Sequence, residues 1–137
     1  MSDLEINAIG QIHITVTDID AAVAFYGDVL GMQLLFRVPE QSMAFFDCGG
    51  IRLYLGPAEG LDRPSRPLVY YRVDGIESAC AAVEGRGAEL EARPHVVHRT
   101  DRMEMWVASL RDPEGNLVCL MEERQLAAGG VSGEVGS

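Results

Sequence analysis

The feature that most constrains this chain is an order of strand-like and helix-like segments that occurs twice. A shift of 57 positions places Ile19 on Ile76 and Val23 on Cys80. Both halves then follow the same order, with one strand, one helix and three further strands. A duplicated βαβββ unit is the simplest explanation of such a repeat.

The first half begins with a segment, residues 11–16, in which apolar and polar side chains alternate, as in a strand with one buried face. A helix is predicted from Ile19 onward, with Asp18 as its N-cap and Gly31 as its end. Three strand-like segments follow, at residues 32–38, 43–48 and 51–56.

The second half repeats these signals. A strand over 68–73 precedes a helix that Asp74 is expected to cap and Gly87 to end. Three strands are predicted after it, at residues 88–98, 103–110 and 116–122. The resulting division is an N-terminal lead (1–9), a first module (10–56), a proline-rich linker (57–67), a second module (68–123) and a flexible tail (124–137).

A four-stranded sheet with one helix buries only the face beneath that helix, so the other face needs cover or a ligand. Two such sheets facing each other would form a cup with the helices outside. The predicted fold class is therefore α+β, with two βαβββ modules forming a U-shaped mixed sheet. His13 and Thr15 would point into the cup, because Ile12 and Ile14 face the helix.

Charge and cysteine content limit the partners and the compartment. The net charge of −10 repels phosphate backbones and anionic membranes, so neither nucleic acid nor a membrane is an expected partner. Three widely spaced cysteines and the lack of a recognisable export signal near the start indicate reduced thiols in the cytoplasm.

Two stretches carry a resemblance to a known family. The segments HITVTDIDAAVAFYGDVLGM and LRDPEGNLVCLME, in this order and combined with the repeat, resemble the vicinal oxygen chelate superfamily. This is the group of glyoxalases, bleomycin resistance proteins and extradiol dioxygenases, and the likeness covers residues 10–123. It implies a U-shaped small-molecule cavity, often a homodimer, and one divalent metal that acts as a Lewis acid on two neighbouring substrate oxygens.

In that family the metal ligands come from the first and last strands of each module. The resemblance places these positions on His13, Leu53, Tyr70 and Cys119. Only His13 is a usual ligand, so the expected set is incomplete, and any divalent metal would be held by a different set that includes His13. The substitutes considered are Glu122, which would need a bulge to reach the same face, and His95.

Three functional hypotheses remain open. The first is a lyase, isomerase or ring-cleaving dioxygenase that acts on vicinal oxygens through a metal at His13. The second is a metal-free protein that binds and sequesters an antibiotic or aromatic metabolite. The third is a metal-free enzyme with His13 as base and Tyr70 as acid. The predicted pocket lining consists of Phe45, Leu53, Met105, Trp106 and Cys119.

Overall fold

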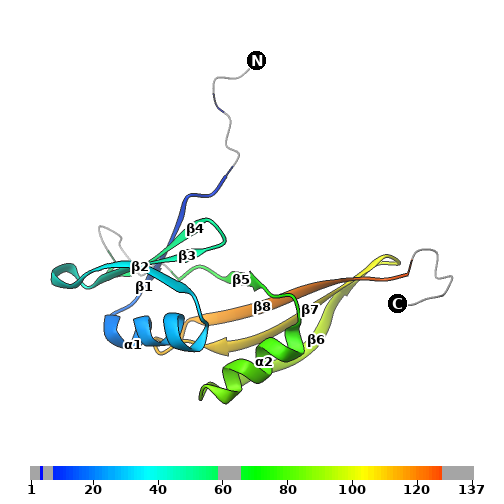
Figure 1. The fold of residues 1–137 in the computed structure, drawn as a ribbon. Helices are drawn as coiled ribbons and strands as arrows, with labels where there is room; N and C mark the ends of the chain where they lie inside the picture. Colours follow the sequence, from blue (N-terminus) through cyan, green and yellow to red (C-terminus); the bar gives the residue numbers. More distant parts are fainter. Residues whose placement is uncertain (1–3, 5–7, 59–65, 128–137) are drawn as a thin grey trace. The chain divides into compact units, whose positions relative to one another are not determined.

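The structure is a computed structural model that describes residues 4, 8–58 and 66–127. The chain folds into two compact units, Met1–Pro67 and Leu68–Ser137. Each unit holds one four-stranded mixed sheet and its own helical segment, which confirms the α+β class and the two modules (Figure 1).

The first module follows the predicted order of elements. Its strands and helical segments are β1 (Gln11–Thr15), α1 (Ile19–Val23), the π-helix η1 (Ala24–Val29), β2 (Gln33–Val38), the 3₁₀ turn η2 (Pro39–Gln41), β3 (Met43–Cys48) and β4 (Ile51–Gly56). The sheet order is β1-β4-β3-β2, with β1 parallel to β4 and the other neighbours antiparallel. Strands β1 and β2 therefore form its two edges.

Local chemistry explains where the first helical segment begins and ends. The carboxylate of Asp18 accepts a hydrogen bond of 3.1 Å from the Ala21 amide, which confirms the predicted cap. The last turns widen into a π-helix, in which the Leu30 amide donates to the Phe25 carbonyl. Gly31 then takes a positive φ of 77°, which releases the chain toward β2.

The second module has the same topology as the first. It consists of β5 (Val69–Arg72), α2 (Ile76–Gly85), β6 (Leu90–Arg99), β7 (Met103–Arg111) and β8 (Leu117–Gln125). Its sheet order is β5-β8-β7-β6, with β5 parallel to β8. Strand β8 continues to Gln125, so the first two residues predicted as tail, 124 and 125, belong to the strand, and residues 128–137 lie outside the described part.

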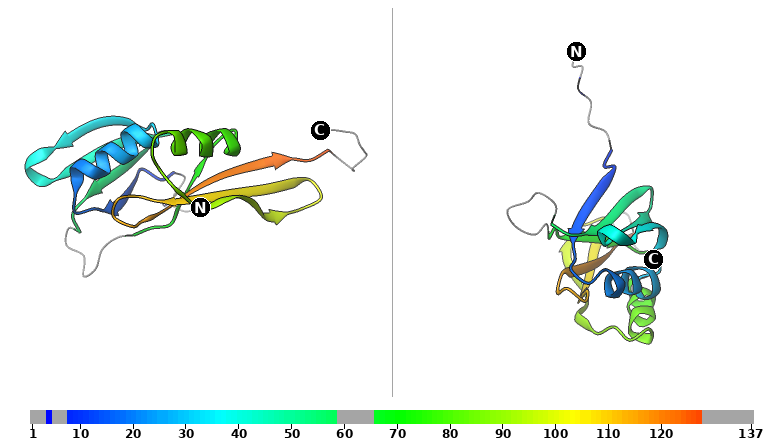
Figure 2. Two further views of the ribbon diagram at one scale, coloured as in Figure 1. Left: turned by 90° about the horizontal axis from the view of Figure 1, so that it is seen from below. Right: turned by 90° about the vertical axis from the view of Figure 1, so that its left-hand side faces the viewer.

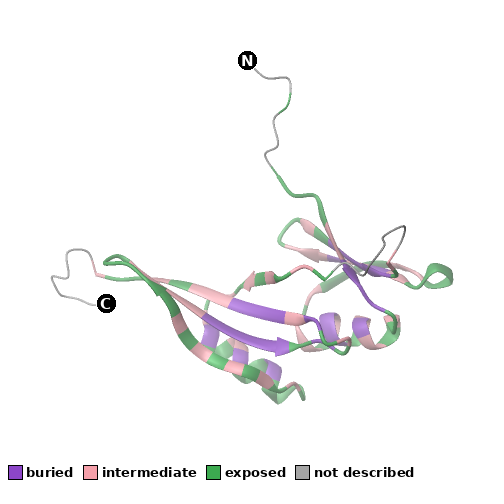
Figure 3. Ribbon diagram, turned by 180° about the vertical axis from the view of Figure 1, so that it is seen from behind, coloured by how far each residue is buried: buried purple, intermediate pink, exposed green. Residues whose placement is uncertain are grey.

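The two modules differ most in the length of their central hairpins. Strands β6 and β7 have ten and nine residues, whereas β2 and β3 have six each. The β6–β7 hairpin extends past the N-terminal start of α2, and its outer part is exposed (Figures 2 and 3). Helix α2 therefore covers only the part of the second sheet where β7 and β8 are buried.

The start of α2 departs from the prediction. The N-cap residue is Gly75, which has no side chain, so the expected cap at Asp74 is wrong by one position. The carboxylate of Glu122 on β8 instead accepts a hydrogen bond of 3.0 Å from the Ile76 amide. A residue distant in sequence thus satisfies one of the amides that a helix leaves open at its start.

A buried carboxylate organises the turn before β8. Asp112 is buried, and its carboxylate accepts hydrogen bonds from the Glu114 amide and from both the amide and the side chain of Asn116. Gly115 supplies the positive φ, 86°, that the turn requires. This stretch is therefore structural.

Candidate functional site

The candidate site lies on the open face of the first sheet. The opposite face, beneath α1 and η1, carries the module's core, which includes Ile14, Ala44, Phe46, Leu53 and Leu55. On the open face, the strand register aligns one ring from each of the four strands. These rings, in sheet order, belong to His13, Tyr54, Phe45 and Phe36. We call this set the aromatic row.

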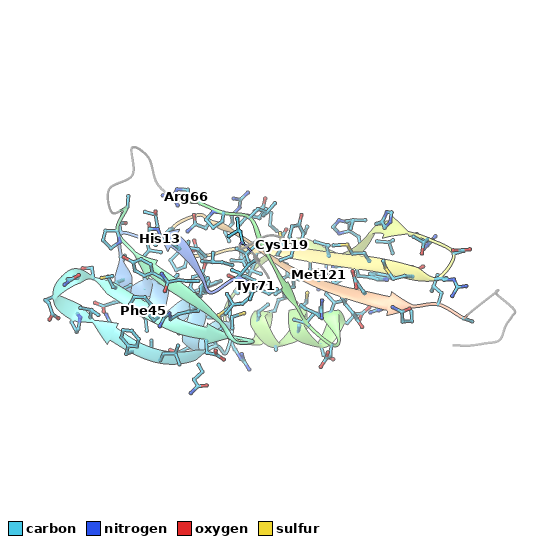
Figure 4. The ribbon with its side chains drawn as sticks, turned by 90° about the horizontal axis from the view of Figure 1, so that it is seen from above. His13, Phe45, Arg66, Tyr71, Cys119 and Met121 are labelled. Carbon is cyan, nitrogen blue, oxygen red and sulfur yellow. The ribbon has the colours of Figure 1, made fainter. Side chains whose placement is uncertain are left out.

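Each ring of the aromatic row stacks on the next. His13 lies 4.4 Å from Tyr54 between ring centroids, Tyr54 lies 4.8 Å from Phe45, and Phe45 lies 4.5 Å from Phe36. The interplanar angles are 29°, 10° and 21°. Figure 4 labels His13 and Phe45, which project from β1 and β3. Stacked contacts of this kind contribute about 0.5–1.5 kcal/mol per pair beyond the area that they bury.

The ring spacings match the ~4.8 Å separation of neighbouring strands. The rings must therefore stand upright on the sheet, with their planes parallel to the strands and their edges toward the open side. Ring edges carry partial positive charge, whereas the face of an aromatic ring is negative. Tyr54 is only 7% exposed, whereas Phe45 is half-buried and Phe36 is 46% exposed. A flat aromatic molecule could therefore receive edge-to-face contacts at the Phe45–Phe36 end of the aromatic row.

Two neighbours fix the aromatic row in place. The ring of Tyr54 lies over Gly56, where an added Cβ would sit only 2.7 Å from Tyr54 Cε1. On the other side, the guanidinium of Arg52 lies 5.8 Å from the Phe45 centroid and donates a hydrogen bond of 2.9 Å to Gln11 Oε1. Gly56 thus leaves room for the Tyr54 ring, and Arg52, which Gln11 holds in position, contacts the Phe45 ring.

The structure moves one predicted site position by a single residue. The prediction placed Leu53 beside His13, but Leu53 pairs with Ile12, is 2% exposed and faces the helix. Tyr54 is the residue opposite His13. The alternation of Ile51, Leu53 and Leu55 with polar or aromatic neighbours contained this information, because the apolar members of a half-buried strand face the helix.

In the second module, the corresponding pair is Tyr70 and Cys119, which lie opposite each other on β5 and β8. Tyr70 is exposed and Cys119 is buried. Burial raises the pKa of the Cys119 thiol, and nearby Arg111 only partly opposes this shift. The thiol is therefore protonated near neutral pH, and a protonated thiol is a poor nucleophile and a poor metal ligand.

The predicted pocket residues Met105 and Trp106 point to opposite faces of the second sheet, as neighbours on one strand must. Trp106 pairs with Glu122 on the face that carries α2, and its indole N–H donates to Glu104. The guanidinium of Arg124 lies 4.5 Å from the Trp106 ring centroid. Met105 lies on the same face as Cys119. Met105 and Trp106 therefore do not line one surface.

The residues at the usual ligand positions do not fit a divalent metal. They are His13 and Tyr54 in the first module and Tyr70 and Cys119 in the second, with no carboxylate among them. Hard divalent ions prefer several oxygen or imidazole ligands. Within residues 8–58 and 66–127, no three His, Cys, Asp or Glu side chains cluster closely enough to hold a metal ion.

The proposed substitute ligands do not complete the set. Glu122 lies on the α2 face, where it caps that helix and accepts a hydrogen bond of 3.1 Å from Arg124. No bulge turns it to the face of Cys119, because the β7–β8 register is continuous there. His95 lies on β6 with its Nδ1 2.7 Å from the Arg93 carbonyl, in an exposed position.

A cavity of about 430 Å³ lies in the first module at the end of the sheet where β1 and β4 finish, and no ring of the aromatic row lines it. It begins at Thr15, which shares the face of His13 and lies two residues further along β1. Its other walls come from the turn after β2 and from the residues that follow β4. The full lining is Thr15, Val16, Thr17, Glu40, Gln41, Ser42, Pro57, Ala58 and Arg66.

Comparison with known proteins places this geometry in a family. The sequence model of the glyoxalase/bleomycin resistance protein/dioxygenase superfamily matches residues 8–120. The chain belongs to that superfamily. The resemblance found in the sequence is thereby confirmed, and the superfamily fold explains the two modules. No curated protein matches the chain significantly.

Solved structures of the superfamily share the fold at low identity. A virulence protein from Salmonella typhimurium is 21% identical, with 87% of this chain and 98% of that chain covered and a TM-score of 0.72. Lactoylglutathione lyase from Agrobacterium tumefaciens is 24% identical, with 94% and 98% covered and a TM-score of 0.68. A superfamily member from Sphaerobacter thermophilus is 22% identical, with 87% and 99% covered and a TM-score of 0.68.

Proposed function

We propose that this superfamily member binds flat aromatic small molecules on the open face of its first module, without a divalent metal at the positions used by the family's enzymes. The aromatic row carries this proposal. It contains one ring from every strand of the sheet, and its accessible part is Phe36, which is 46% exposed, with the half-buried Phe45 beside it. A largely apolar floor with a few polar groups beside it is what small-molecule sites commonly share.

The donor set supports the metal-independent form of the proposal. A Lewis-acid lyase, isomerase or dioxygenase would need a bound cation near the substrate oxygens. Tyr54 uses its ring in the aromatic row, and Cys119 is held as a thiol. Only His13 remains as an ordinary ligand at the four positions, so the binding hypothesis fits these residues better.

The test compares 2-naphthol with decahydro-2-naphthol by calorimetric titration in the presence of EDTA. The two compounds share a skeleton and a hydroxyl group, but only the first is flat and aromatic. We expect the naphthol to bind and to raise the melting temperature, because a ligand of the folded state stabilises it. We expect no measurable binding of the saturated compound.

Two variants locate the contact. Phe45→Leu removes a central ring of the aromatic row and should weaken naphthol binding about fivefold, since an edge-to-face contact of this kind is worth about 1 kcal/mol. Phe25→Leu removes a ring from the helix side of the same module and should leave affinity unchanged. Equal effects of both variants, or binding that depends on an added divalent metal, would contradict the proposal.

We also propose a cytoplasmic location and a homodimer. Cys48, Cys80 and Cys119 are all free thiols, as expected for a chain in a reducing compartment. The dimer rests on family resemblance alone, and sedimentation equilibrium of the untagged protein tests it. Of the helices in the described part of the chain, none combines the length and apolar character that a membrane span needs.

A further inference from the structure

We infer that the preferred ligand of the first module is a flat aromatic ring that carries a neutral carboxamide group, bound between Arg52 and Asp47. This inference deepens the proposed function and rests on it. It follows from a second row of side chains on the open face, from the hydrogen bonds that two of its members can still make and from the balance of their charges.

A row of polar side chains lies beside the aromatic row, on the side where β1 and β4 begin. The strand register aligns one of them from each strand, and in sheet order they are Gln11, Arg52, Asp47 and Gln33. We call this set the polar row. Side chains two residues apart on a strand share a face, and on β2 the bulge compensates for the odd spacing. Both rows therefore belong to one surface.

The polar row meets the aromatic row at its accessible end. Asp47 and Phe45 lie two residues apart on β3, which is about 6.6 Å at the ordinary strand rise. The Arg52 guanidinium carbon lies 5.8 Å from the centroid of the Phe45 ring. Arg52 is exposed and Asp47 is half-buried. A polar group attached directly to a ring at Phe45 can therefore reach both side chains from the open side.

Arg52 and Asp47 lie directly opposite each other and both have hydrogen-bonding capacity left. Arg52 donates from Nε to Gln11 Oε1 at 2.9 Å, which leaves its two Nη groups as further donors. Among the residues that the structure describes, no ion pair joins Arg52 to Asp47, and no group donates to the Asp47 carboxylate. Opposite residues of neighbouring strands stand about 4.5–5.5 Å apart at Cβ, so one small group can contact both.

The charges of the polar row favour a neutral group that both accepts and donates. Arg52 and Asp47 contribute one positive and one negative charge, which cancel. A carboxamide oxygen can accept from Arg52 while the amide NH₂ donates to Asp47, and hydrogen bonds to charged groups are the stronger kind. A carboxylate would instead bring a second anion beside Asp47, in a chain with a net charge of −10.

The experiment uses three compounds with the same ring and substituents of the same shape: 2-naphthamide, 2-acetonaphthone and 2-naphthoate. The ketone keeps the oxygen that accepts from Arg52 but has a methyl group in place of the amide donor, and the acid has a second anionic oxygen there. Calorimetric titration of the full chain at neutral pH should rank the amide about fivefold tighter than either of the others.

A change at Asp47 should reverse part of this order. In Asp47→Asn the new side chain can donate to a carboxylate and no longer repels it, so naphthoate should bind more tightly than naphthamide. The affinity of the ketone should stay the same, which shows that the variant is folded and that its ring site is intact. Arg52→Gln should weaken the binding of all three compounds, because each one presents an oxygen to the guanidinium.

The matched control is Asp28→Asn on η1, an exposed position in the same module, which changes the net charge equally and should keep the wild-type order. If the ketone or the acid binds as tightly as the amide, or if Asp47→Asn leaves the order unchanged, the carboxamide site is wrong while ring binding stands. The same conclusion follows if 2-naphthol binds and none of the three compounds does. If 2-naphthol fails to bind as well, the proposed function itself fails.

Discussion

At the scale of single residues, the site depends on which of two neighbours faces the open side of a strand. Tyr54 faces His13 and Leu53 faces the helix, and this parity replaces a metal ligand position with an aromatic ring. The same alternation separates Met105 from Trp106. Which of two neighbouring residues faces the open side thus decides whether that side carries metal ligands or aromatic rings.

Gly56 gives the first residue-scale prediction. Gly56→Ala should lower the free energy of unfolding by about 1–3 kcal/mol, because the added Cβ would meet the Tyr54 ring at 2.7 Å and overpack a filled site. The matched control is Gly85→Ala near the end of α2, where an added Cβ meets nothing within 4 Å. That change should be neutral or slightly stabilising, since alanine favours helix. Equal urea midpoints for the two variants would refute the role of Gly56.

At the scale of elements, the second module fastens its helix to its sheet through β8. Glu122 accepts from the first amide of α2, and Arg124 pairs with both Glu77 on that helix and Glu122 beside it. Arg124 also stacks on Trp106. Glu122 and Trp106 were candidates for a metal site and a pocket in the sequence, and the structure assigns them to helix attachment.

Glu122 therefore carries an element-scale prediction. Glu122→Ala should destabilise the protein by about 1 kcal/mol, because the Ile76 amide would lose its cap. Glu123→Ala, on the next residue and the opposite face, should change stability by less than ~0.5 kcal/mol. Guanidinium denaturation followed by circular dichroism measures both. A larger loss for Glu123→Ala would exclude the capping role.

At the scale of the whole molecule, the repeat gives two modules of one topology with different surfaces. The first has a short hairpin and the aromatic row. The second has a longer hairpin, and Tyr70 and Cys119 occupy the positions that correspond to His13 and Tyr54. The longer hairpin, together with the longer turn before β8 (residues 112–116 against 49–50), explains why Tyr54 and Cys119 are 65 positions apart, while His13 and Tyr70 are 57 apart. A single sequence shift could not place both pairs.

The ionisable groups of both modules predict a pH window of stability. Hydrogen bonds from Arg124 and Arg111 lower the pKa values of Glu77 and Glu91 below 4.5. Their contribution is complete above the unfolded pKa and is lost as the pH falls through the folded pKa. Burial raises the pKa values of the three cysteine thiols above 9.0, so their contribution is complete below 9.0 and is lost as the pH rises through the folded values.

Urea denaturation between pH 3 and pH 11 measures this window. The free energy of unfolding should be flat between about pH 5 and pH 8 and fall on both sides. Glu77→Gln should reduce the acid-side slope, because it removes the carboxylate that pairs with Arg124. The matched control is Glu123→Gln, because Glu123 follows Glu122 on β8 and lies on the opposite face of the sheet. This change should leave the acid-side slope unchanged. A profile that rises above pH 9.0 would contradict the buried-thiol assignment.

The sequence by itself determined the repeat, the order of elements, the α+β class and the Asp18 cap, because periodicity and capping chemistry are local. It also placed His13 on the open face. Only the tertiary structure decided the partner of His13, the cap of α2 and the faces of Met105 and Trp106. Those outcomes depend on strand register and on contacts between residues far apart in sequence, and a slip of one residue reverses the face of every side chain in a strand.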